Sequence, residues 1–473
     1  MKKKIIIILN QSLYIKNYIN TDSFKSLDKK YSVYYVLDSS INETQLKKII
    51  HKQLYRKFKK KIILFFKYKK IETKFFSMLF NRVQLRNRNK FKNISINVKR
   101  QLVFKLFYNF VNDTFVTVIK RFLLWCIKFL SRILNHLFIH EIFDEIFKKF
   151  IKENQSLVAI YKKVNPDLVI IPFSGNHISM FDSIRYFKKI NQKKIFLLSE
   201  NWDNLFSRYM INHPSYIGVW GQQSKNILKV HKFKGNAYNL GAPRLQLYFK
   251  ERYKKYKKPY NFNYAVYFDN ASPKKNDNLI FLNKIDNFIE KNKKDFKNFK
   301  LIFRPHPYTY LRSIDLINFK KYKNIILDPQ MKSRYNYNLI SSKIRSSDAK
   351  YSIGLIKNAK FIVCSTSSVI IEASIFYKKI IVYSPRNNSY SNESSLIDFY
   401  EHLKDIKKFP NIKICYDENK IGYMFKEFIS DKLKLNKNLI DKFRNKVLYS
   451  NKLSYEKRLY NAVNKIINEN KIN

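Results

Sequence analysis

The sequence predicts an α/β protein with two doubly wound, Rossmann-like domains that face a cleft. Two observations predict this class. From Pro166 onward, short apolar runs alternate with polar turns and amphipathic stretches. The alternation occurs in two series, which the polar and basic stretch 250–258 separates. Short buried strands that alternate with helices are typical of parallel sheets covered on both faces.

The first series predicts an N-terminal domain over 1–248. Its first strand is the run of isoleucines at 5–9, because no small-residue cleavage site follows it, as a signal peptide would require. The expected strands are 5–9, 31–37, 168–173, 195–199, 216–220 and 236–240, and the expected helices are 178–189 and a helix from Gln223.

A basic helical insertion is expected inside this domain, at about 45–160. The first proline is Pro166 and the first glycine is Gly175, and a long stretch without either residue favours helices. The most apolar part, 122–139, is interrupted by Lys128 and Arg132 and is too short for a membrane span. Two interpretations remain open: a helix packed on its own domain, or a helix lying on an anionic membrane with Trp125 at the boundary.

The second series predicts a linker at 249–262 and a C-terminal domain over 263–432. A helical segment is expected to follow at 433–473. Within the second domain, the expected strands are 264–268, 301–303, 324–327, 361–364 and 380–383, and the expected helices are 279–291, 351–358 and 367–377.

Composition excludes several classes of protein. The chain has 473 residues, 45% of them hydrophobic, which rules out wholesale disorder. Its three cysteines are far apart in sequence, so neither a disulfide scaffold nor a zinc finger is expected, and the cytoplasm is the expected compartment. The net charge of +58 has two open explanations: an anionic partner, or codon bias toward lysine on tolerant surfaces.

A Ser/Thr-rich turn follows one predicted strand of the second domain. In KFIVCSTSSVIIEAS, the hydroxyls of Ser365, Thr366, Ser367 and Ser368 stand where a helix begins. The first turn of a helix has unpaired N–H groups, so hydroxyls added there suit a diphosphate. Glu372, about one turn further on, is a candidate for ribose hydroxyls. The alternative is ordinary helix capping by serine.

A second candidate site is LIFRPHP, in which Arg304 and His306 follow a predicted strand. Arginine binds phosphate oxygens in a bidentate manner, and histidine donates to a phosphate or protonates a leaving oxygen. Both residues would lie at the carboxyl end of the sheet, where open α/β sheets bind ligands. The alternative is a proline-rich turn with surface charges.

Polar residues follow the predicted strands of the first domain in the same way. In SENWDN, Glu200 or Asp203 is the candidate general base for an acceptor hydroxyl. An ordinary Asn/Asp turn is the alternative. The residues expected on the acceptor side of this edge are Ser174, His177, Asn201 and Arg244.

Several motifs are absent from the sequence. It has no Walker A loop and no G-x-G-x-x-G, which argues against a P-loop NTPase and a typical NAD enzyme. No Asp-x-Asp occurs, so no dedicated metal site and no bound cofactor are expected.

Taken together, the motifs NWDN, GVWGQQSKN, LGAPR, FRPHP and STSSVIIEAS resemble bacterial surface carbohydrate biosynthesis proteins of the GT-B glycosyltransferase type. The second half also resembles CDP-glycerol glycerophosphotransferases. The resemblance covers roughly 160–400. It implies that the second domain binds a nucleotide-activated donor through Arg304, His306 and the turn 366–368, with Glu372 facing the ribose. It also implies an acceptor in the first domain and a final helical segment that crosses back to it.

The resulting hypothesis is a metal-independent transferase. It would move a sugar, or a polyol phosphate from a CDP-polyol, to a glycan or lipid-linked acceptor, as capsule synthesis requires. Attachment to the inner face of the membrane is a further hypothesis. Three alternatives stay open: a nucleotide-sugar 2-epimerase on the same fold, a nucleic-acid-binding protein driven by charge, and a scaffold without catalytic activity.

Overall fold

The computed structural model contains two compact units. It describes residues 2–67, 153–173, 178–190, 195–207, 214–230, 233–269, 277–306, 319–331, 349–385, 397, 401–430 and 434–469. The first unit is Met1–Gln246 together with Lys446–Asn473, and the second is Leu247–Asn445. Residues 249–262, predicted as a linker, therefore belong to the second unit.

The first unit is built on a seven-stranded parallel sheet in the order β3-β2-β1-β4-β5-β6-β7. The strands are β1 (Lys4–Leu9), β2 (Ser32–Asp38), β3 (Ile62–Phe66), β4 (Leu168–Phe173), β5 (Ile195–Ser199), β6 (Tyr216–Val219) and β7 (Asn236–Asn239). Strand β1 pairs with β2 on one side and β4 on the other, and Ile5 lies opposite both Val33 and Leu168.

Alternation along β1 explains why both faces of this sheet are covered. Ile6 and Ile8 point into one apolar core, and Ile5, Ile7 and Leu9 point into the other. Successive side chains of a strand face opposite sides, so an uninterrupted apolar run requires a helical layer on each face.

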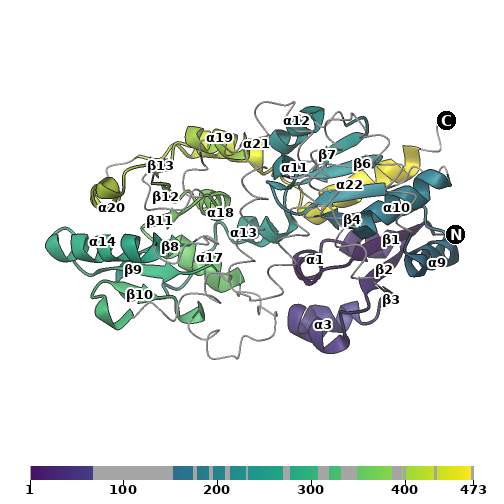
Figure 1. Cartoon of the computed structure of the whole chain (residues 1–473), viewed down its shortest axis with the longest axis horizontal. Coiled ribbons are helices and arrows are strands. Elements are labelled where there is room, and N and C mark those ends of the chain that lie inside the picture. Colours follow the sequence, from purple (N-terminus) through teal and green to yellow (C-terminus); the bar gives the residue numbers. More distant parts are fainter. Residues whose placement is uncertain are drawn as a thin grey trace, which may run out of the picture. The chain divides into compact units, whose positions relative to one another are not determined.

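The helices of the first unit form these layers (Figure 1). They are α1 (Ser12–Tyr14), a π-helical turn (Ile15–Ile19), α2 (Lys25–Lys30), α3 (Glu43–Ile49), α4 (Lys52–Phe58), α9 (Gln155–Val164), α10 (Ile178–Lys189), α11 (Asn204–Ser207), α12 (Gln222–Val230) and α22 (Tyr455–Asn468).

Helix α22 comes from the C-terminal part of the chain and packs in the second core of the first unit. Ser454 caps its start by accepting from the Lys457 N–H at 3.2 Å. Its buried face repeats at helical spacing through Leu459, Val463 and Ile466.

One correction concerns the insertion predicted as helical at about 45–160. Within it, Ile62–Phe66 forms β3, the edge strand of the first sheet. The run IILFF is β-branched and aromatic, which favours a strand, and its flanking lysines conceal this signal. Residues 68–152, including the stretch around Trp125 and Cys126, lie outside the described residues.

The second unit contains a six-stranded parallel sheet in the order β10-β9-β8-β11-β12-β13. Its strands are β8 (Asn263–Phe268), β9 (Phe299–Arg304), β10 (Ile325–Leu327), β11 (Phe361–Cys364), β12 (Lys379–Tyr383) and β13 (Ile412–Cys415). Its helices include α14 (Asp277–Lys291), α17 (Ala349–Asn358), α18 (Val369–Ile375), α19 (Glu401–Lys404) and α20 (Ile421–Ile429). Two further helices, α13 (Gln246–Lys250) and α21 (Lys437–Val447), contain the points at which the chain passes from one unit to the other.

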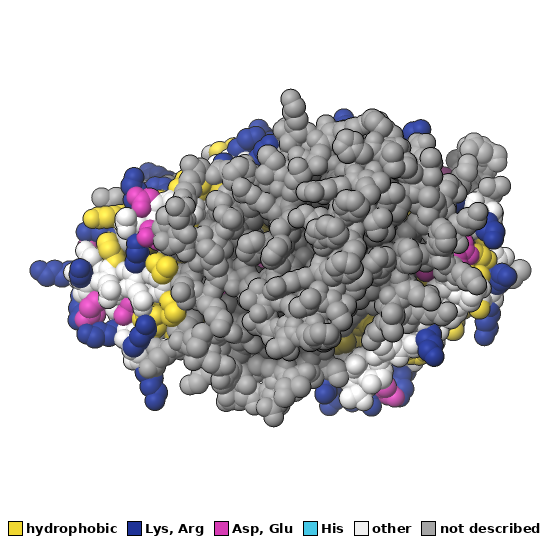
Figure 2. Space-filling model, viewed as in Figure 1, with side chains coloured by type: hydrophobic (Ala, Val, Ile, Leu, Met, Phe, Trp, Pro, Cys, Tyr) yellow, Lys and Arg dark blue, Asp and Glu magenta, His cyan; other side chains and the backbone are white. Residues whose placement is uncertain are grey.

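The predicted fold class of two doubly wound parallel sheets is confirmed. The strands expected from 168–173 and 195–199 are found at those positions. No helix among the described residues has the length and apolar character that a membrane crossing needs. On the described parts of the surface in Figure 2, Lys and Arg side chains lie scattered rather than gathered in one patch.

Candidate functional site

Both sheets have a topological switch point at which the strand order reverses. In the first sheet it lies between β1 and β4, and in the second between β8 and β11. Open α/β sheets bind ligands outside the carboxyl ends of the strands at such points. Most of the site residues predicted from sequence follow the carboxyl end of a strand.

Glu200 follows β5 and is buried, with 1% of its surface exposed. The Asn17 amide donates to its Oε1, and within the described residues its Oε2 has no hydrogen-bond partner of normal geometry. Asn17 and Tyr18 lie on the π-helical turn, an element often found at functional positions. The sequence analysis missed both residues, because they precede Glu200 by more than 180 positions.

Burial raises the pKa of Glu200 to about 7, and the Asn17 hydrogen bond and the positive charge of Arg244 oppose that rise. Arg244 lies over the Trp220 ring, with its guanidinium carbon 5.4 Å from the ring centroid. The Trp220 indole in turn donates to the carbonyl of Ser199 at 3.1 Å. Arg244, predicted on the acceptor side, therefore lies in the electrostatic environment of Glu200.

Asp203 is the more accessible of the two predicted carboxylates, because its side chain is only half-buried. It belongs to a turn in which the Asn201 N–H donates to Asn204 Oδ1 at 2.6 Å. The alternative of an Asn/Asp turn is thus realised here, and it holds the Asp203 side chain at the sheet edge. Ser174 and His177 lie outside the described residues.

In the second unit, the Ser/Thr turn lies at the switch point, between β11 and α18. Its serines do not cap the helix. Ser368 stands at the N-cap with helical backbone angles and makes no side-chain cap hydrogen bond. Ser368 therefore does not cap the helix with its side chain, as the alternative explanation of this motif would require.

Three serine hydroxyls at this edge lack a hydrogen-bond partner within the described residues: Ser365, Ser367 and Ser384. Ser365 and Ser367 follow β11, and Ser384 follows the neighbouring β12. Leaving a buried polar group unpaired costs about 1–3 kcal/mol, so native proteins contain few such groups. Ser365 and Ser367 thus place two unpaired hydroxyls after β11, a strand of the switch point, and Ser384 adds one after its neighbour β12.

Glu372, predicted to face a ribose, lies inside α18 with 8% of its surface exposed. Its Oε2 accepts from the Tyr248 hydroxyl at 3.2 Å, and its Oε1 accepts from Ser368 Oγ at 3.4 Å. Both oxygens of this carboxylate therefore have protein partners, and the contact with a ribose stays a prediction.

Arg304 ends β9 and is buried in an ion pair with Asp328, which follows β10. Its Nη2 also donates to Gln330 Oε1 at 2.7 Å and to Ser352 Oγ at 3.3 Å. Sequence reasoning predicted a phosphate clamp at this position. In the structure both Nη atoms already have protein partners, so a phosphate would have to compete with a buried carboxylate.

His306 lies two residues beyond Arg304, and burial lowers its pKa to about 4. The imidazole is therefore neutral near pH 7. A neutral imidazole still donates one hydrogen bond to a phosphate, but it is a poor source of a proton for a leaving oxygen.

Asp269 is a residue of this edge that the sequence analysis missed. It directly follows β8, the other strand of the switch point, and is 5% exposed. Its N–H donates to the Arg304 carbonyl at 3.1 Å, which links the β8 and β9 ends. The signal was present in the sequence as an acid after the run YAVYF.

The comparisons with known proteins establish the fold. No protein-family model matches the sequence, and the comparison with curated proteins finds no match. A UDP-GlcNAc 2-epimerase from Neisseria meningitidis bound to UDP-GlcNAc is similar with a TM-score of 0.52 and 10% identity, covering 98% of this chain and 100% of that chain. A second UDP-N-acetylglucosamine 2-epimerase is similar with a TM-score of 0.51 and 11% identity, covering 100% of this chain and 98% of that chain. A glycosyltransferase from Rickettsia africae has a TM-score of 0.48 and 12% identity, covering 100% of this chain and 99% of that chain.

At these identities the similarity to the two epimerases defines the fold and nothing finer. The chain has the GT-B fold of two Rossmann-like units. The narrower resemblance to CDP-glycerol glycerophosphotransferases stays a prediction.

Proposed function

We propose that the protein is a metal-independent GT-B enzyme that transfers a sugar, or a sugar-like polyol phosphate, from a nucleotide-activated donor to a surface-glycan acceptor. One observation carries the donor half of this proposal. The switch point of the second sheet holds a Ser/Thr turn whose buried hydroxyls are not used as helix caps. Such donors suit a diphosphate, whose oxygens only accept hydrogen bonds.

In the proposed sugar transfer, the bond between the sugar carbon and the donor diphosphate breaks, and a bond from that carbon to the acceptor oxygen forms. In a polyol-phosphate transfer, the bond between the two phosphates breaks instead, and a nucleoside monophosphate leaves. Ser365, Ser367 and the neutral His306 would donate to the departing phosphate group, on which negative charge grows. Arg304 would act by fixing the β9 end through Asp328, rather than by clamping phosphate itself.

The acceptor hydroxyl must lose a proton to a base. Asp203 is the better placed candidate for direct contact, because its side chain is partly exposed. Glu200 has a pKa near 7 that suits proton transfer at neutral pH, but its burial supports a role in holding Tyr18 and Arg244 around the acceptor. Replacing each carboxylate by its amide separates the two roles: loss of turnover with unchanged donor binding marks the base.

A UDP-sugar 2-epimerase is the second candidate function. The observation that favours it is that the two similar structures described above with TM-scores above 0.5 are UDP-GlcNAc 2-epimerases. Incubation with a UDP-sugar and no acceptor discriminates between the two functions, because an epimerase isomerises the sugar and a transferase leaves it unchanged or slowly hydrolyses it.

Nucleic-acid binding and membrane attachment stay predictions that rest on the charge of +58. A nucleic-acid ligand would bind with a steep dependence on salt and without competition from nucleotide sugars. Flotation with vesicles of anionic lipid tests membrane attachment in the same preparation.

The decisive experiment is a calorimetric titration with UDP-, CDP- and GDP-activated sugars and CDP-polyols. For whichever donor binds, Ser367→Ala should lower the affinity by at least about tenfold, because a hydrogen bond to a charged group is worth roughly 1.5–3 kcal/mol. Ser430→Ala is the matched control, since that serine lies on the surface and donates to the Glu427 carbonyl. No binding by any donor, or equal binding by Ser367→Ala, would overturn the assignment.

A further inference from the structure

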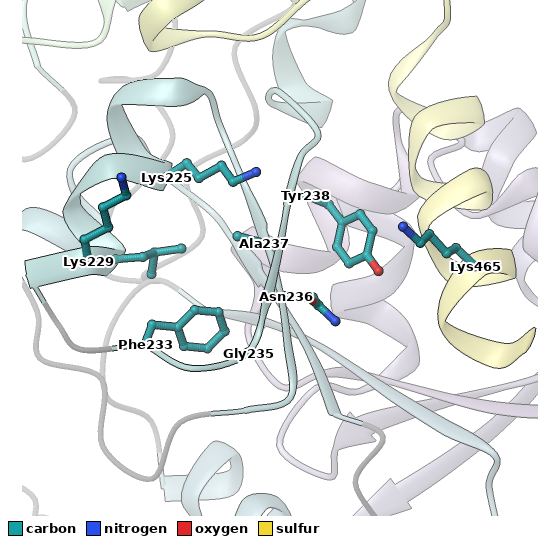
Figure 3. Close-up of a pocket in the computed structure, with 9 residues that line it drawn as sticks. Lys225, Lys229, Phe233, Gly235, Asn236, Ala237, Tyr238 and Lys465 are labelled. Carbon is teal, nitrogen blue, oxygen red and sulfur yellow. The ribbon is translucent and has the colours of Figure 1, made fainter. Parts of the chain in front are cut away.

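A pocket of about 400 Å³ lies beside β7 in the first unit (Figure 3). Its volume is in the usual range of small-ligand and peptide sites, roughly 300–1,000 Å³. Lys225 and Lys229 of α12, Phe233, Ala237 and Tyr238 around the strand, and Lys465 of α22 are among its lining residues. It involves the start of β7, at the opposite end of the strand from Arg244, so it is distinct from the candidate active site.

The strand at this pocket is an edge strand. Within the described residues, β7 pairs with β6 alone. Asn236 and Leu240 donate their N–H groups to the β6 side, at 2.9 and 2.8 Å. Because backbone groups alternate along a parallel strand, those of Ala237 and Asn239 face away from β6. Ala237 lines the pocket, and Asn239 continues the same edge beyond it, so the outward backbone groups have the spacing of a sheet ladder.

The lysines flank this edge on both faces of the sheet. Figure 3 shows Lys225 reaching toward the strand from α12 and Lys465 reaching toward it from α22, with Tyr238 between them. All three pocket lysines are exposed, and none forms an ion pair with another described residue. The nearby carboxylate of Glu469 accepts from the hydroxyls of Tyr216 and Tyr238, at 3.1 and 3.5 Å.

We propose that this edge binds an acidic polypeptide segment in an extended conformation, which adds to β7 as a further strand. Only a polypeptide offers the regularly spaced N–H and C=O groups that pair with a strand edge. Side chains of an added strand point alternately to the two faces, where lysines stand on both sides. A nucleic acid or a free phosphate would use the lysines but not the backbone row.

The competing explanation is that these lysines only protect the edge from unwanted pairing, as charged residues do in many sheets. The two explanations differ in outcome. Protection means that acidic peptides do not bind and that removing lysines promotes self-association, whereas docking means that removing lysines weakens a measurable complex.

The test uses the full-length protein and a fluorescein-labelled peptide of Glu-Glu-Thr-Thr repeats, which places Glu on both faces of a strand. Its counterpart is N-methylated at alternate residues, so that its charge is the same and its ladder hydrogen bonds are lost. Fluorescence anisotropy should show binding of the first peptide and at least about tenfold weaker binding of the second. A duplex DNA that competes as strongly as the peptide itself would overturn the proposal.

Two variants assign the contact. Ala237→Pro removes one outward N–H without breaking a bond to β6, since proline is tolerated where that group faces away from the sheet. It should abolish the preference for the unmethylated peptide. Lys465→Glu should weaken binding about fivefold, and Lys457→Glu, an exposed lysine of the same helix outside the pocket, should have little effect.

Circular dichroism and melting temperature confirm that each variant is folded. Equal loss in both lysine variants, or a peptide preference that survives in folded Ala237→Pro, would show that binding is non-specific attraction to a basic surface. Either result contradicts strand addition.

Discussion

The carboxyl edges of the two sheets have corresponding switch points but differ in the polar groups that they bury. The first edge buries a carboxyl group, Glu200, which accepts from the Asn17 amide and interacts electrostatically with the Tyr18 phenol. The second buries a cation already neutralised by Asp328, beside serine hydroxyls that lack partners. The same topology thus surrounds its buried acids differently: burial raises the pKa of Glu200 to about 7 in the first unit, whereas Asp328 in the second unit is paired with Arg304.

The largest expected effect tests the claim that Arg304 is structural. Arg304→Ala leaves the Asp328 carboxylate buried without a counter-charge, which should cost about 3–5 kcal/mol of unfolding free energy. Urea unfolding of the purified variant measures this cost. The contrast is Lys284→Ala, which breaks a more exposed ion pair with Glu418 and should cost no more than about 1 kcal/mol. Similar losses of unfolding free energy in the two variants would contradict a structural role of Arg304.

The second prediction concerns pH. Glu200 has a folded-state pKa of about 7, raised from 4.5 by burial, so the folded protein keeps the proton that the unfolded chain releases. Stability should therefore fall by about 3 kcal/mol as pH rises from about 4.5 to 7, and then level off. The unfolding free energy, measured from urea unfolding at several pH values in this range, should depend less on pH in Glu200→Gln. Asp182, whose pKa burial also raises to about 7, adds a similar decline that Asp182→Asn removes.

If the slope is unchanged in Glu200→Gln while Asp182→Asn alone flattens it, then the carboxyl of Glu200 is solvated, and the contrast between the two edges is lost.

A third prediction compares two serines that precede helices. Ser454→Ala removes the cap of α22 and should cost about 1 kcal/mol. Ser367→Ala removes a hydroxyl without a partner in the described residues and should change stability by less than about half of that, while it weakens donor binding. Thermal unfolding with and without the nucleotide donor measures both. Equal destabilisation by the two variants would return the Ser/Thr turn to a capping role.

The smallest expected effect is the change in the pKa of Glu200 caused by Arg244→Met. Loss of the positive charge should raise the pKa of Glu200 further above 7, by less than about one unit. Carbon-13 NMR of labelled glutamate reports the titration directly. Arg244→Lys keeps the charge and should leave the midpoint near its original position, so a shift in that variant as well would point to packing on Trp220 instead.

Sequence reasoning located the buried strands well, because a parallel strand covered on both faces is a continuous apolar run such as LVIIPF. It failed where charge breaks the run. Strand β13 reads IKIC, with a lysine in its middle, and was not predicted. At the sites, sequence indicated which residues follow strands, but not their partners. Asn17 meets Glu200 and Asp328 meets Arg304 only because the sheet order brings distant segments together.

The return of α22 to the first unit has a consequence for how the chain is made. The second unit, Leu247–Asn445, is complete before the last part of the first unit has been translated. Until Leu459, Val463 and Ile466 leave the ribosome, one apolar face of the first sheet is covered only in part, by the helices near the N-terminus. The unit encoded first therefore matures last, and during synthesis its exposed isoleucines are the surface that chaperones have to shield.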